Sequence, residues 1–184
     1  MNINKIILKI TLSAMFLSIG ITLPFLTGQI QTLGQMLSPM HLPVLLCGFI
    51  CGPIYGLIVG FSLPLLRSLM FSMPPLYPAA IAMAFELGTY GIMCGILYPV
   101  FNKLIKNEIA QIYPPLVISM FSGRIVWGVI RFLLAIIDKT LMFNMNTFIS
   151  GALLTVWPGI IIQLILVPII IYSLKKANLL SKLK

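Results

Sequence analysis

Residues 42–71 read LPVLLCGFICGPIYGLIVGFSLPLLRSLMF, two apolar runs that are interrupted once, at Gly52-Pro53. The first run has about ten residues, half of the roughly 20 that a helix needs to cross a bilayer. Proline suits the first turn of a helix and disfavours helix in the residue before it. The stretch therefore predicts a half-length helix that ends at 52, followed directly by a full-length helix from 53.

The rest of the chain divides into four further apolar segments, which polar or proline-rich stretches separate. We predict helices over 6–26, 42–52, 53–71, 79–101, 115–137 and 148–174. Apolar residues make up 60% of the sequence and charged residues only 8%, against about 25% charged residues in soluble domains. We therefore expect one all-α membrane domain over residues 1–184, with no room for a separate soluble domain.

The basic residues predict how the helices are oriented. Cytoplasmic segments hold most of the lysines if the N-terminus lies in the cytoplasm, as the positive-inside rule requires. These lysines are Lys5, Lys9, Lys103, Lys106, Lys175, Lys176, Lys182 and Lys184. We expect both termini inside, in a bacterial cytoplasmic membrane. The net charge of +9 is spread over helix ends and single positions, which argues against nucleic-acid binding.

Several polar residues fall inside predicted spans, where one Arg at the bilayer centre costs about 2.5–3.5 kcal/mol. Counted from the helix ends, Glu86 and Arg131 lie at a similar depth near the outer face, and Arg124 lies near the middle. We therefore predict a substrate pocket that opens outward. Its candidate residues are His41, Arg67, Glu86, Tyr90, Arg124, Trp127, Arg131, Trp157 and Gln163.

Two interpretations of these residues are open. Glu86 and one arginine could do no more than lock helices 79–101 and 115–137 together. Alternatively, Arg124, Trp127 and Arg131, which share one helix face, line a pocket in which charges fix the orientation of a ligand. Three arginines against one carboxylate favour the pocket. We expect Arg131 and Glu86 to face one another and to hold the same substrate. For Arg124, a structural link to backbone carbonyls is an equally good account, and His41 either rims the pocket or is solvated.

Small residues form a second pattern. Ala14, Ser18 and Thr22 are spaced i, i+4, i+8 along the first helix, and such a smooth stripe predicts a surface for a partner protein. A set of glycines in the next three helices instead predicts close packing within the chain. This set comprises Gly48, Gly52, Gly56, Gly60, Gly88, Gly91 and Gly95.

The sequence lacks the motifs of an ATPase or a metalloenzyme. It has no Walker motif, no HExxH and no aspartate pair. We expect no catalytic residue, no metal and no cofactor, so any ATP hydrolysis would belong to separate subunits. An intramembrane enzyme or a structural membrane subunit is the alternative of another class.

The stretch PMHLPVLLCGFICGPIYGLIVGFSLPLLRSLMF, followed by MPPLYPAAIAMAFELGTYG and GRIVWG, resembles the substrate-binding S components of energy-coupling factor (ECF) vitamin transporters. The likeness covers almost the whole chain. It implies a six-helix S-component fold and a vitamin bound near the outer face. It also implies a complex with a membrane coupling protein and two ATPase subunits. The coupling protein would contact an AxxxA-type stripe on the first helix, where this chain has Ala14 and Ser18.

The substrate is open between two chemical classes. Aromatic walls beside a carboxylate suit a ring vitamin such as pyridoxine or hydroxymethylpyrimidine, because Glu86 would accept hydrogen bonds from a ring N–H or an amine. The surplus of arginines suits the carboxylate of pantothenate. From the sequence we favour the ring vitamins, with pantothenate as the alternative.

Overall fold

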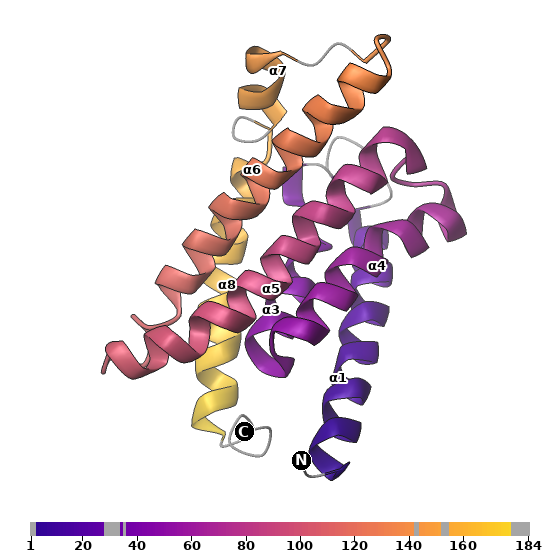
Figure 1. The fold of residues 1–184 in the computed structure, drawn as a ribbon. Helices are drawn as coiled ribbons and strands as arrows, with labels where there is room; N and C mark the ends of the chain where they lie inside the picture. The colour runs from indigo at the N-terminus through magenta and orange to yellow at the C-terminus, as the bar shows by residue number, and fades with distance from the viewer. Residues whose placement is uncertain (1–2, 28–33, 35, 142–143, 152–154, 178–184) are drawn as a thin grey trace.

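The computed structural model describes residues 3–27, 34, 36–141, 144–151 and 155–177, and within these residues the chain is helical without β-strands. The elements in chain order are α1 (Ile3–Thr22), η1 (Leu23–Thr27), α3 (His41–Cys51), α4 (Pro53–Phe71), η2 (Leu76–Ala80), α5 (Ile81–Leu104), α6 (Tyr113–Ile137), α7 (Met145–Ile149) and α8 (Trp157–Lys176). Figure 1 shows them as one bundle, with the beginning of α1 and the end of α8 at the same end.

Within the described residues, five helical segments are long and apolar enough to cross a membrane: Ile3–Leu26, Pro53–Phe71, Leu76–Leu104, Tyr113–Ile137 and Trp157–Lys176. The sixth predicted helix, α3, is apolar but has only 11 residues. The chain is thus an all-helical membrane protein, as predicted, in which one helix is too short to span a bilayer alone.

The predicted break at Gly52-Pro53 is confirmed. α3 ends at Cys51, α4 begins at Pro53, and Gly52 between them has a φ of 102°. That φ lies in the left-handed region, which glycine adopts without the steric penalty of a Cβ. The reversal of direction between α3 and α4 therefore depends on this one glycine.

The predicted helix over 148–174 is wrong at its beginning. The chain forms the short helix α7 over Met145–Ile149, and α8 begins only at Trp157. Pro158 lies in the first turn of α8, where its missing N–H costs nothing and its fixed φ favours a helix start. Residues 150–151 and 155–156, between the two helices, lie at the site described below.

Five of the seven predicted packing glycines bring the backbones of α3, α4 and α5 into direct contact: Gly48, Gly56, Gly60, Gly91 and Gly95. A Cβ at Gly52 would meet no atom within 4 Å, so close packing does not explain that glycine. A Cβ added at Gly91 would overlap the backbone of Gly56, and one added at Gly48 would overlap the carbonyl of Gly91. Nine of the 11 residues of α3 are buried, and the helix packs against α1, α4, α5 and α8. α3 is therefore an internal helix that its neighbours surround.

Candidate functional site

A cavity of about 470 Å³ lies at the end of the bundle opposite the beginning of α1. Its wall is formed where α1 passes into η1, where α3 begins, where α4 ends, by α5 and α6, and by residues 147, 150–151 and 155–156. Small-molecule sites in proteins have volumes of roughly 300–1,000 Å³. The cavity is therefore large enough for a compact organic molecule.

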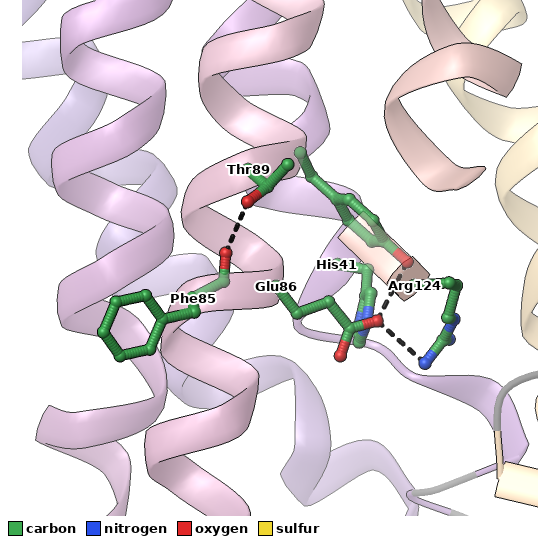
Figure 2. Close-up of polar contacts among 6 residues, drawn as sticks. His41, Phe85, Glu86, Thr89 and Arg124 are labelled. Carbon is green, nitrogen blue, oxygen red and sulfur yellow. Dashed lines mark hydrogen bonds and ion pairs between the residues drawn. The ribbon is translucent and has the colours of Figure 1, made fainter. Parts of the chain in front are cut away.

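Glu86 of α5 is the centre of the polar cluster beside the cavity (Figure 2). Its Oε1 accepts hydrogen bonds from Arg124 Nη1 at 2.8 Å and from the hydroxyl of Tyr90 at 2.9 Å, and it lies 3.4 Å from His41 Nε2. The Glu86 side chain is 1% exposed, whereas that of Arg124 is 13% exposed. The guanidinium therefore offers the larger surface to the cavity, and the carboxylate lies behind it.

The local sequence explains how the cluster is positioned. Glu86 and Tyr90 are one helical turn apart on α5, so their side chains lie on the same face. Gly123 of α6 leaves room for Tyr90, since a Cβ there would overlap the tyrosine ring. His41 belongs to the cluster because the short helix α3 begins inside the bundle, and the residue is only 2% exposed. Each polar group thus comes from a different helix, except for the Glu86–Tyr90 pair.

The predicted pairing of Glu86 with Arg131 is wrong, because the ion pair of Glu86 is with Arg124. Counting depth from helix ends assumes that neighbouring helices end at the same level. Figure 1 shows instead that α6 extends beyond the beginning of α5. Arg124 lies 13 residues before the end of α6, about 20 Å along its axis, and so reaches the level of Glu86.

Arg67, near the end of α4, is largely engaged by the protein. Its Nη1 donates to the carbonyl of Ile21 in the last turn of α1, and its guanidinium carbon lies 5.1 Å and 5.6 Å from the ring centroids of Phe25 and Phe71. A cation between two aromatic faces is stabilised by the ring quadrupoles. Arg67 therefore links the end of α1 to α4. It also lines the cavity, although it is only 3% exposed.

Arg131 and Trp127 form the other polar part of the α6 wall. The guanidinium carbon of Arg131 lies 6.0 Å from the centroid of the Trp127 ring, which stacks on Phe148 of α7 with centroids 6.3 Å apart. Glycine makes this contact possible, since a Cβ at Gly151 would overlap the Trp127 ring. The predicted face of α6 with Arg124, Trp127 and Arg131 is therefore turned toward the cavity.

Of the nine predicted pocket residues, six line the cavity: His41, Arg67, Glu86, Arg124, Trp127 and Arg131. Tyr90 contacts Glu86 from behind the wall, Gln163 is buried elsewhere in α8, and Trp157 is 57% exposed on the surface of the bundle. The cavity also has lining residues that were not predicted, among them Met73–Pro75, Thr147 and Ser150. Residues 72–78 lie between two predicted helices and contain three prolines, a pattern that indicates a turn but no binding site. Thr147 and Ser150 lie among apolar residues, so the sequence gives no signal for them.

Two buried nitrogen atoms of the cluster have no hydrogen-bond partner among the described residues, His41 Nδ1 and Arg124 Nε. Buried polar atoms are normally paired, and those that are not point to a ligand, a water molecule or a rearrangement at the site. The arrangement can bind and orient a polar molecule.

Comparison with known proteins gives one family. Residues 8–173 match the family model described as ECF transporter, substrate-specific component. No curated protein and no solved structure matches the chain. The family match spans every helix that lines the cavity.

Proposed function

The chain belongs to the substrate-specific components of ECF transporters, and from this membership we propose that it is the high-affinity binding subunit of an importer for a water-soluble vitamin or vitamin precursor. The observation that carries the proposal is the cavity of about 470 Å³ with an ionised cluster in its wall, inside a bundle of apolar helices. Ionisable residues at membrane depth are expensive and mark substrate or ion pathways.

We place the termini in the cytoplasm of a bacterial cell, which puts the cavity at the outer face. The beginning of α1 and the end of α8 lie at one end of the bundle, and the basic residues of the last turn of α8, Lys175 and Lys176, lie there too. With α3 and α4 as a hairpin, the six helices then run inward and outward in turn. Such an arrangement presents the cavity to substrate arriving from outside.

The partners we propose are a membrane coupling protein and two ATPase subunits, and the partner surface is the stripe Ala14, Ser18 and Thr22. All three residues are exposed on α1. Ser18 Oγ donates to the Ala14 carbonyl at 3.0 Å and Thr22 Oγ1 to the Ser18 carbonyl at 3.1 Å, so both hydroxyls are satisfied within the helix. The stripe is consequently smooth and neutral, which suits close approach of another helix.

Pyridoxine, hydroxymethylpyrimidine and pantothenate are the candidate substrates. The geometry weakens the main argument for the two ring vitamins, because Oε1 of Glu86 already accepts from Arg124 and Tyr90 and the carboxylate is almost completely buried. An intramembrane enzyme is the alternative of another class; it would convert the small molecule instead of releasing it unchanged.

Native mass spectrometry of the purified protein tests the proposal. We expect a small molecule of vitamin size to dissociate from the protein on activation in the gas phase, and this molecule should have the same mass as the one supplied. A product that differs from the molecule supplied would support the enzyme. Absence of any bound small molecule, with no thermal stabilisation by any of the three candidate vitamins, would contradict the binding subunit.

A further inference from the structure

The charges that line the cavity do not balance. Its wall contains the guanidinium groups of Arg67, Arg124 and Arg131 but only one carboxylate, that of Glu86. Two formal positive charges are left over. Residues 28–33, 35, 142–143 and 152–154, which adjoin lining segments in the sequence, contain no Asp, Glu, Lys, Arg or His, so they do not alter this count.

The sequence contains only three Asp and Glu residues, and the two besides Glu86 do not line the cavity. Glu108 pairs with Lys175 at 3.1 Å, at the end of the bundle where α8 finishes. Asp138 lies partly buried after the end of α6, is not part of the cavity wall, and accepts hydrogen bonds from Thr140, which lower its pKa. Neither acid lines the cavity.

Glu86 and Arg124, the two partners of the buried ion pair, differ in exposure and therefore in role. Arg124 uses Nη1 for Glu86, and its side chain is the more exposed of the two. A guanidinium has five N–H donors in a planar fork, so Arg124 keeps donors for an anion after it has paired with Glu86. Glu86, which Tyr90 and His41 contact in turn, holds Arg124 in place and is a positioning residue.

We infer that the substrate is a small organic anion, a carboxylate or a phosphate monoester, whose charged end is bound by Arg124 and Arg131 on the cavity face of α6. The inference rests on the proposed function and selects among its substrates: it favours pantothenate over pyridoxine and hydroxymethylpyrimidine. Inside a membrane bundle the effective dielectric constant is low, so an anion gains more from two surplus positive charges than it would in water. A neutral molecule of the same shape gains less, because it offers the guanidinium groups hydrogen-bond acceptors but no opposite charge.

The test uses matched pairs of probes that differ mainly in the anionic group. These are pantothenate and panthenol, nicotinate and nicotinamide, and pyridoxal phosphate and pyridoxal. Calorimetry on the detergent-purified protein should show one anionic probe binding roughly 10- to 150-fold more tightly than its neutral partner, the range of one charge-assisted hydrogen bond. The first two pairs report a carboxylate site and the third a phosphate site.

Variants of α6 assign the effect to the proposed residues. Arg131→Gln and Arg124→Lys should each reduce the ratio of anion affinity to neutral affinity at least tenfold; Arg124→Lys keeps a cation beside Glu86 and so preserves the fold. Lys139→Gln is the control, because it removes a positive charge from an exposed residue after α6 that does not line the cavity. An unchanged ratio in both arginine variants would overturn the inference.

Each remaining outcome of the probe experiment either supports or overturns the inference. A neutral probe that binds as tightly as its anionic partner overturns the inference and leaves the binding subunit intact. If none of the probes binds, the charge of the molecule released from the purified protein decides: an anion supports the inference, and a neutral or cationic molecule refutes it. If nothing is released either, the proposed function fails, and the inference fails with it.

Discussion

Replacing Glu86 by Gln should destabilise the protein severely, because it leaves the Arg124 guanidinium without its buried counter-charge. Oε1 lies 2.8 Å from Arg124 Nη1, and the side chains are 1% and 13% exposed. Removing one partner of a buried ion pair costs about 3–5 kcal/mol. A chain of this size loses about 2–4 °C of Tm per kcal/mol, so we expect Tm to fall by about 6–20 °C.

The chain contains its own reporter for this measurement. Cys47, Cys51 and Cys94 are free and buried, with exposures of 0%, 1% and 0%. A thiol-reactive fluorescent dye will therefore label them only as the protein unfolds on heating. Glu108→Gln is the matched control: its ion pair with Lys175 is exposed, and such pairs contribute about 0–1 kcal/mol.

The double variant Glu86→Gln/Arg124→Gln, compared with the two single variants in a double-mutant cycle, tests whether the two residues stabilise the protein as a pair. It removes both charges and leaves two neutral amides that can hydrogen-bond to each other, so it should recover most of the stability lost in Glu86→Gln. If Glu86→Gln unfolds at the wild-type temperature, or if the double variant is less stable than the sum of the two single changes, the pair does not stabilise the bundle.

Three further outcomes are expected. Gly123→Ala should lower the stability of the bundle by about 1–3 kcal/mol, because the new Cβ overlaps the Tyr90 ring; an unchanged Tm in the same dye assay would contradict this packing. Trp in place of Ala14 should abolish uptake in cells while ligand binding by the purified protein stays normal. Met15→Trp is the control and should have little effect, because Met15, beside Ala14 on α1, is already large and exposed. Uptake at the wild-type rate in Ala14→Trp would place the partner surface elsewhere. In intact cells, an impermeant thiol reagent should label cysteines introduced at 36–37 or 140–141, which are not buried, but not at 103–108, and labelling at 103–108 would reverse the orientation.

The sequence was sufficient for features that depend on local chemistry. The Gly52-Pro53 break follows from a positive φ beside a proline, and the close packing of glycines follows from the absence of a Cβ. Both properties belong to the residues themselves and survive in any tertiary context. For the same reason the long apolar helices other than α8 were placed correctly to within a few residues.

The pairing within the site could not be predicted in the same way. Which arginine reaches Glu86 depends on how far α6 extends past α5, and this offset is a property of the whole bundle. Residues 148–156 were assigned to a continuous helix because their hydropathy is high, although Trp157-Pro158 is a helix start signal. The cavity residue Ser150 was missed as a consequence.

The length of α3 has a consequence for how the protein enters the membrane. Eleven residues rise about 16 Å, roughly half of a hydrocarbon core about 30 Å thick. Alone in lipid, the helix would leave its polar ends and His41 without water or partners. Synthesis delivers α1 before it and α4 directly after it, but α5 and α8, which also pack against it, emerge later. The helix therefore completes its packing only when α8 has been inserted, and the His41–Glu86 contact forms only after α5 has been made.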